Sequence, residues 1–135
     1  MNELDTKQKV LISIYTEYQK DLPDMSQNIN PEILGIDIAT MNVALEKLDN
    51  EGYITGVKFA RGGRGNRIIG VIKDNMMMTR LGITYVEEKL DISPTLTAGE
   101  KVSEVSKKVT SWGYAELKDF AAKVTGEIVK GTVGL

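Results

Sequence analysis

A glycine- and arginine-rich segment between two stretches of β-forming residues restricts the fold of this chain more than any other feature. Residues 53–59 and 67–73 are rich in β-branched and aromatic side chains, which favour strands. The sequence between them, Ala60-Arg61-Gly62-Gly63-Arg64-Gly65-Asn66, turns easily and sustains neither a helix nor a strand. The pattern predicts a β-hairpin with a glycine-rich tip, so the rest of the fold has to be built around a two-stranded ribbon.

Three helices are predicted ahead of this hairpin. The first covers residues 6–20, where apolar residues recur with helical spacing. A second, short helix begins at the Asn-Pro pair 30–31, because an asparagine cap followed by proline is typical of a helix start, and Gly35 ends it. A third begins after Asp37 and ends before Gly52. Its apolar residues, Met41, Ala44, Leu45 and Leu48, have the spacing of one helix face.

A fourth helix follows the hairpin. After residues 74–78, which form a link or a short strand, Thr79 caps a helix that carries apolar residues on one face as far as Leu90. The Ser-Pro pair 93–94 then marks a boundary, since the residue before a proline avoids helical geometry. We therefore predict a domain over residues 1–92.

Residues 93–135 form a predicted helical extension with two apolar stripes. The stripes are Val102, Val105, Val109 and Trp112, then Leu117, Ala121, Val124 and Ile128, and they change phase near Gly113. Exposed apolar stripes are costly in water, so we expect them to pair with the same region of a second subunit and form a homodimer. Contact of residues 120–135 with a membrane surface or with another protein is the weaker alternative.

The order of these elements is that of a winged helix-turn-helix domain, which belongs to the α+β class. Two motifs agree with it: Leu34-Gly35-Ile36-Asp37 leads into a helix that ends Leu48-x-x-x-Gly52-Tyr53-Ile54, and Met78-Thr79-x-x-Gly82 follows the hairpin. On these motifs, residues 6–91 resemble the YjcQ-like winged-helix family of bacteria and their phages. The resemblance implies an architecture and little biochemistry. The Arg-Gly-Gly-Arg-Gly tip and the C-terminal tail are expected to be features that the family resemblance does not include.

Positive charge is concentrated in the hairpin. The net charge of the chain is −2, and residues 1–57 hold ten carboxylates against four lysines, whereas residues 58–73 hold five basic residues and no acid. Arginine on a flexible ribbon suits phosphate and a narrow, electronegative minor groove. The residues of this wing that we predict to contact DNA are Lys58, Arg61, Gly62, Gly63, Arg64 and Arg67, the glycines because they let the backbone approach closely.

The helix over residues 37–51 is the candidate recognition helix. In a helix-turn-helix, the N-terminal half of this helix lies in the major groove, where outward side chains meet base edges. The outward residues predicted to contact DNA are Thr40, Asn42, Val43 and Lys47, with Thr40 on phosphate, Asn42 on adenine and Lys47 on either. Such residues are also common on an ordinary solvated helix, and carboxylates such as Glu46 repel phosphate.

The composition excludes most familiar enzyme chemistry. The chain has no cysteine and no histidine, which removes disulfides, thiol nucleophiles, histidine-based triads and zinc sites built from these residues. Its glycine spacing fits neither a dinucleotide fingerprint nor a phosphate loop, so we expect no enzymatic activity, no cofactor and no metal. It has no signal-like segment and no apolar run long enough to span a membrane, so we expect a cytoplasmic location.

These features together predict a transcriptional regulator of bacterial or phage type that binds double-stranded DNA. The alternative is a winged-helix protein–protein interaction module without direct DNA binding. In that case helix 37–51 faces a protein and the acidic residues 1–57 dock a basic partner. The arginines of the wing discriminate between the two, because DNA binding needs them and a protein adaptor does not.

Overall fold

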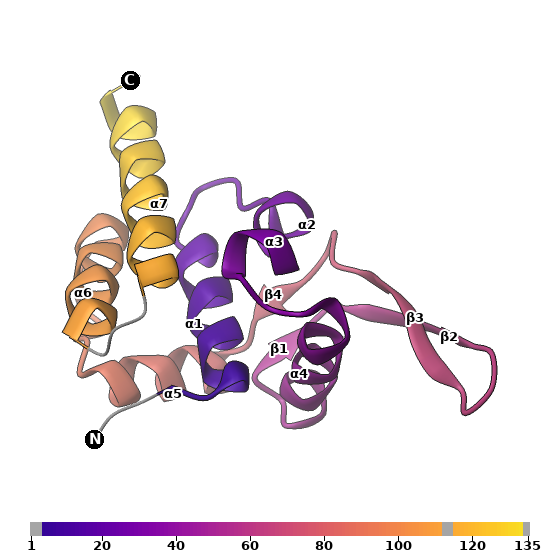
Figure 1. Ribbon diagram of the computed structural model, residues 1–135. Helices are drawn as coiled ribbons and strands as arrows, with labels where there is room; N and C mark the ends of the chain where they lie inside the picture. The colour runs from indigo at the N-terminus through magenta and orange to yellow at the C-terminus, as the bar shows by residue number, and fades with distance from the viewer. Residues whose placement is uncertain (1–3, 112–114, 134–135) are drawn as a thin grey trace.

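The computed structural model describes residues 4–111 and 115–133. The elements of this part of the chain are α1 (Thr6–Tyr18), α2 (Met25–Asn28), α3 (Pro31–Leu34), α4 (Ile38–Asn50), β1 (Ile54–Thr55), β2 (Lys58–Gly62), β3 (Arg67–Ile72), β4 (Met77–Met78), α5 (Arg80–Leu90), α6 (Ala98–Ser111) and α7 (Ala115–Val133). Figure 1 shows the helices gathered in one body, from which the β2–β3 hairpin projects to the right. The architecture is α+β, with the element order of a winged helix and a C-terminal helical extension, as predicted.

Helix α1 lies at the centre of the fold. Asp5 caps it, because its side chain accepts a hydrogen bond from the Gln8 amide while the Gln8 side chain accepts one from the Asp5 amide. All residues from Lys9 to Glu17 are buried, so the helix is covered on every side rather than on one face. Its neighbours are α2, α4, α5, α6, α7 and β4. The core therefore reaches from the helix-turn-helix to the C-terminal extension.

The helix-turn-helix is formed by α3 and α4. Asn30 caps α3 through a 2.9 Å hydrogen bond from the Ile33 amide, and Gly35 ends the helix in the left-handed conformation with φ of 64°. This conformation is the one that glycine adopts without strain, which explains the tight turn into α4. The short helix α2, which the sequence did not predict, precedes α3 and buries Met25.

The predicted hairpin is divided into two separately paired parts. β2 pairs with β3, but β1 pairs with β4, so residues 74–78 contain a strand and not only a link. The interruption lies at Gly56, where φ is +82° and a Cβ atom would lie 1.9 Å from the Asn75 carbonyl oxygen. Because the two chain segments cross so closely here, a continuous ladder from residue 53 to residue 73 is not possible.

Helix α5 is anchored to the turn after α4. The Thr79 hydroxyl donates a hydrogen bond to the Gly52 carbonyl at 2.6 Å and accepts one from the Gly82 amide at 3.0 Å. A Cβ atom at Gly82 would lie 2.1 Å from the Tyr53 carbonyl oxygen, so only glycine fits this crossing. The Thr-x-x-Gly motif thus joins the start of α5 to the turn that follows α4.

The extension folds back onto its own chain. Helices α6 and α7 pack against each other and both contact α1. Their apolar stripes, Val102, Val105, Val109, Leu117, Ala121 and Val124, are buried in the same core cluster as the winged helix. Within the described residues these stripes are therefore covered by the chain's own core, and no second subunit is needed to bury them; Trp112 and Gly113 lie outside the described residues. The predicted dimer loses its supporting argument and stays a prediction.

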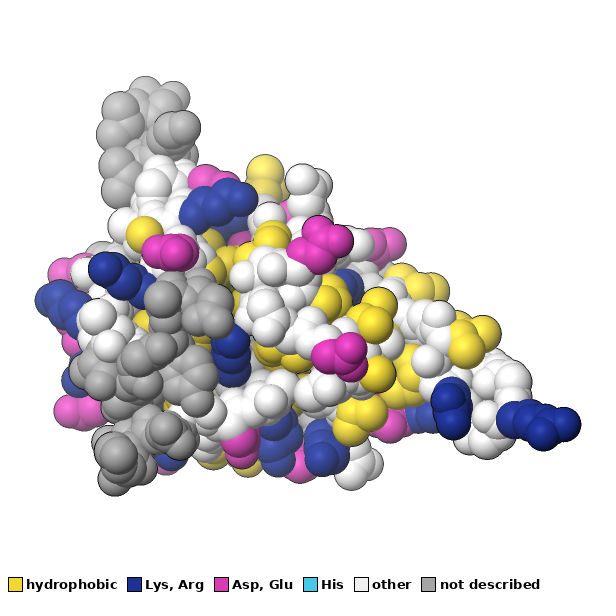
Figure 2. Space-filling model, viewed as in Figure 1, with side chains coloured by type: hydrophobic (Ala, Val, Ile, Leu, Met, Phe, Trp, Pro, Cys, Tyr) yellow, Lys and Arg dark blue, Asp and Glu magenta, His cyan; other side chains and the backbone are white. Residues whose placement is uncertain are grey.

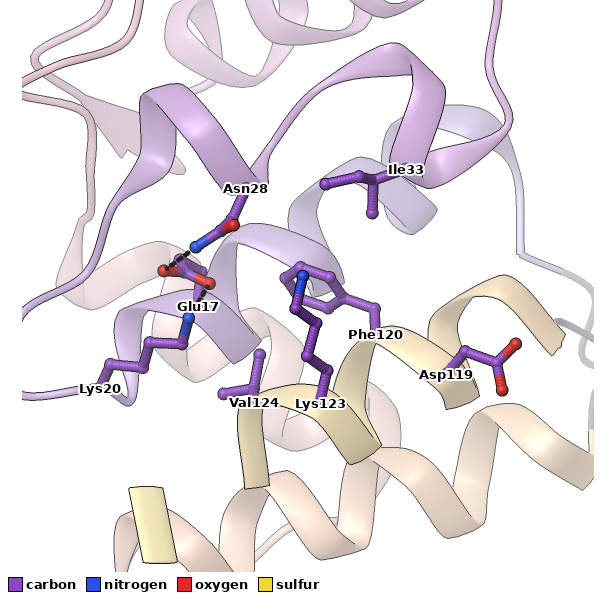
Figure 3. Close-up of a pocket in the computed structure, with 8 residues that line it drawn as sticks. All are labelled: Glu17, Lys20, Asn28, Ile33, Asp119, Phe120, Lys123 and Val124. Carbon is purple, nitrogen blue, oxygen red and sulfur yellow. Dashed lines mark hydrogen bonds and ion pairs between the residues drawn. The ribbon is translucent and has the colours of Figure 1, made fainter. Parts of the chain in front are cut away.

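A buried carboxylate connects α7 to the first helices. Glu17 is completely buried, and its Oε2 atom accepts hydrogen bonds from the Asp24 amide at 2.9 Å and from the Asn28 side chain at 3.0 Å. Lys20 forms an ion pair with Glu17 (Figure 3) and a second ion pair with Glu127 of α7. Burial lowers the pKa of Lys20, but the bonds to both carboxylates outweigh it and raise the pKa above its ordinary value. The lysine is therefore held in its charged form.

Candidate nucleic-acid interface

The structure places the predicted recognition helix with its N-terminal half open. Asp37 caps α4, since its side chain accepts a hydrogen bond from the Thr40 amide at 3.2 Å. The inner face of the helix is buried as the spacing predicts, at Met41, Ala44, Leu45 and Leu48. The cap therefore occupies the Thr40 amide with a carboxylate of this chain, and the outward side chains are the groups that this half of the helix offers to a partner.

The outward side chains of α4 differ in their exposure to solvent and in their hydrogen bonding. Thr40, Val43 and Lys47 are exposed, with 45% of the surface of Val43 accessible. Asn42 is half-buried, and its amide makes no hydrogen bond to any residue that the structure describes. Ile38, which was not among the predicted site residues, is 63% exposed at the start of the helix. The exposure of this isoleucine is known only from the structure, because its spacing from Met41 and Leu45 is that of the apolar face.

The tip of the wing is a turn that contains residues in the left-handed backbone conformation. Gly63, Gly65 and Asn66 all have positive φ, between 52° and 79°. A Cβ atom at Gly63 would meet no atom within 4 Å, so there is open space beside its backbone; its contact with DNA stays a prediction. Gly62 has an additional reason to be glycine, because a Cβ atom there would lie 3.1 Å from the Ile69 side chain.

The strand register gives the wing two unlike faces. Residues opposite each other in an antiparallel pair share a face. Phe59 lies opposite Val71, and both side chains pack against the core. Lys58 lies opposite Ile72 on the other face, and both are exposed. A bulge between Ala60 and Arg61 shifts the register before the tip.

Arg61 connects the wing to α4. Its guanidinium forms an ion pair with the Glu46 carboxylate of α4 and donates a hydrogen bond to the Asn66 carbonyl at 3.2 Å. Sequence reasoning treated Glu46 only as a carboxylate that repels phosphate. No local pattern predicts this pairing, because it depends on how the hairpin lies over α4. The pairing neutralises one of the wing arginines and brings the wing beside the outward face of the helix.

Three predicted cations of the wing remain available. Lys58, Arg64 and Arg67 are exposed, and none forms an ion pair with a residue that the structure describes. Figure 2 shows Lys and Arg side chains at the far right end of the molecule, where the hairpin ends. Lys73 serves a different purpose, since its ammonium group donates a hydrogen bond to the Ile29 carbonyl and burial lowers its pKa.

One of the acidic groups near α4 is also neutralised within the protein. Glu51, directly after the helix, lies 2.9 Å from the Lys7 ammonium group. The hydrogen bond from Lys7 to Glu51 raises the pKa of this lysine despite an opposing effect of burial. With Glu46 held by Arg61 and Glu51 held by Lys7, these two carboxylates in and directly after α4 oppose an approaching phosphate less than unpaired carboxylates would.

The comparisons with known proteins identify the family. The family model described as YjcQ protein matches residues 8–112. The chain belongs to the YjcQ protein family. The match includes the glycine-rich wing and α6, so the family extends beyond the resemblance over residues 6–91 that the motifs predict. No curated protein and no solved structure gives a significant match to the chain.

Two further findings concern membrane-spanning helices and metal sites. None of the helices in the described residues is both long and apolar enough to cross a lipid bilayer. Within the same residues, no three acidic, cysteine or histidine side chains come together in a group able to hold a metal ion.

Proposed function

We propose that this protein binds duplex DNA and acts as a transcriptional regulator, with α4 in the major groove and the β2–β3 wing on the minor groove or the phosphate backbone. The observation that carries the proposal is the ion pair between Arg61 and Glu46. It sets the wing beside the outward face of α4, so that one surface offers both the open half of a recognition helix and a cationic ribbon.

The cations supply the attraction to phosphate. Lys58, Arg64 and Arg67 are exposed and free of carboxylate partners among the described residues. Neutralisation of phosphates by such side chains releases counterions, which makes the affinity strongly dependent on salt. Arg61 contributes less than the sequence suggests, because Glu46 already neutralises it. The open space around the backbone of Gly63 at the tip of the wing allows DNA to approach this backbone closely.

A protein–protein interaction module is the second candidate, and one observation favours it. Ile69 and Ile72 on β3 are 70% and 52% exposed, although large apolar side chains are normally covered. A partner protein packed against the wing would cover such side chains. This function needs no free arginine at the tip, so titration with DNA separates the two candidates.

The test is an anisotropy titration of a labelled random-sequence duplex at several salt concentrations. The double variant Arg64→Ala/Arg67→Ala should bind more weakly, and its log-affinity against log-salt slope should be flatter by about 0.9 per lost phosphate contact. The matched control Lys107→Ala/Lys118→Ala removes the same charge from α6 and α7, at the other end of the molecule (Figure 1), and should leave the slope unchanged. If the parent protein fails to bind any duplex, or if both double variants behave alike, the proposal is wrong.

A further inference from the structure

Apart from the Thr40 hydroxyl and the Asn42 amide, the outward surface of the first two turns of α4 is apolar. Ile38 and Val43 are 63% and 45% exposed, and Ala39 is exposed between them. Ala39 and Val43 have the spacing that places two residues on the same helix face, and Ile38 and Asn42 have it on the adjoining face. A solvated helix normally carries polar side chains here, so this surface is unusual for a helix with no covering element.

The edges of base pairs in the major groove offer one apolar group, the C5-methyl of thymine. An amide pairs with adenine through two hydrogen bonds, and Asn42 has an amide without a partner in the described residues. Guanine is read mainly by arginine or lysine. Helix α4 contains no arginine, and its single lysine, Lys47, lies in the C-terminal half of the helix.

The wing provides an independent argument for the same base pairs. Arg64 and Arg67 lie at the tip of a ribbon whose turn includes Gly63 and Gly65. Stretches of A·T base pairs narrow the minor groove and strengthen its negative potential, which attracts inserted arginine side chains. A short, glycine-rich arginine tip is therefore suited to A·T-rich DNA.

We propose that the DNA site of this protein is A·T-rich, and that α4 reads it by apolar contact with thymine methyl groups. Val43 and Ala39 lie against the methyls, Ile38 extends this contact at the helix start, and Asn42 bonds an adenine. This inference rests on the proposed function, because it names the base pairs that the same surface recognises.

Replacement of thymine by uracil tests the contact, since it removes only the methyl group from the major groove. Three duplexes of equal length are compared: one of A·T base pairs, the same duplex with uracil in place of thymine, and one of G·C base pairs. The A·T duplex should bind more tightly than the G·C duplex. Each buried methyl should account for about a fourfold loss in affinity on replacement by uracil.

A variant of the helix assigns the effect to its residue. Val43→Ala shortens an exposed side chain, so the fold should persist, and the difference between the thymine and uracil duplexes should shrink. The control Asn50→Ala changes an exposed residue at the end of α4 and should leave the difference intact. Equal binding of the thymine and uracil duplexes by the parent protein overturns this inference while DNA binding stands. Failure to bind all three duplexes overturns the proposed function and the inference together.

Discussion

The guanidinium of Arg61 in the wing is paired with the carboxylate of Glu46 in α4. The two side chains are 35% and 40% exposed, so water screens the pair, and such pairs contribute at most about 1 kcal/mol to stability. Its main consequence concerns charge, because one basic and one acidic group cancel on the surface that we propose to face DNA.

Glu46→Gln should therefore strengthen DNA binding. The substitution removes a carboxylate that repels phosphate and releases Arg61, so we expect a higher affinity at low salt. The log-affinity against log-salt slope should become steeper by about 0.9 for one new phosphate contact. Anisotropy titrations measure both quantities. Glu88→Gln, an exposed carboxylate on α5, is the control for loss of one negative charge; an equal gain in both variants would show that Arg61 is not released onto DNA.

Two substitutions on opposite faces of α4 should change different properties, one the stability of the protein and the other its discrimination between base pairs. Leu45 is 1% exposed, so Leu45→Ala leaves a cavity and should lower the free energy of unfolding by about 2–5 kcal/mol. Asn42 makes no hydrogen bond to a described residue, so Asn42→Ala should change stability little while it weakens discrimination at one base pair. Urea denaturation gives the first quantity and competition with altered duplexes the second. A large loss of stability in the Asn42 variant would contradict the helix faces described above.

Gly82→Ala should destabilise the protein through a backbone clash. The new Cβ atom would lie 2.1 Å from the Tyr53 carbonyl oxygen, so α5 has to shift away from the turn after α4, at a cost of about 1–3 kcal/mol. Gly126→Ala in α7 is the matched control, since it meets no atom within 4 Å. There alanine should stabilise the helix by about 0.5–1 kcal/mol. Thermal unfolding of both variants checks the two signs.

Phe120→Ala should destabilise the whole protein and not only the extension. Phe120 is 5% exposed in the core cluster that also contains residues of α1 and α4, so the loss should be about 3–5 kcal/mol with a single unfolding transition. Lys118→Ala on the same helix is the exposed control.

A chain that ends at Ile92 should unfold at a lower urea concentration than the full chain, because α1 loses the part of its cover that α6 and α7 provide. Light scattering on the full chain and the shortened chain tests the predicted dimer, and equal stability of the two chains would show that the extension is a separate unit.

Raising the pH above 10 should weaken the fold. The buried Tyr15 hydroxyl donates a 2.9 Å hydrogen bond to Glu87 Oε2, and Lys101 lies 2.8 Å from the same oxygen. Burial, and then the bond to Glu87, raise the pKa of Tyr15 above its ordinary value of about 10. A raised folded-state pKa contributes stability that is present below the unfolded-state pKa and is lost as the pH rises above it.

Urea denaturation between pH 7 and pH 11 should therefore show a falling midpoint above pH 10. In Tyr15→Phe the fall should be smaller, because the titrating hydroxyl is absent, while stability at pH 7 should be lower by about 1–3 kcal/mol. A parent protein whose midpoint stays constant to pH 11 would contradict the proposed contribution of this hydroxyl.

The helices and turns of this protein were predictable because their signals are local. The caps at Asn30, Asp37 and Thr79 act within one helical turn, and a left-handed glycine such as Gly35 ends a helix by its own conformation. The buried face of α4 follows from the periodicity of its apolar residues. The sequence by itself therefore determined the order of the main helices, the position of the wing tip and the two faces of the candidate recognition helix.

Only the tertiary structure decided which distant segments meet. The close crossing of Gly56 and Asn75 divides the ribbon into two pairs of strands, and periodicity does not predict a contact between such segments. An apolar stripe shows that a helix needs a partner without showing which one, so the burial of Val105 and Val124 within the chain's own core came from the fold. The pairing of Arg61 with Glu46 is of the same kind: the charge of each residue is written in the sequence, but their attraction depends on a distance that only folding sets.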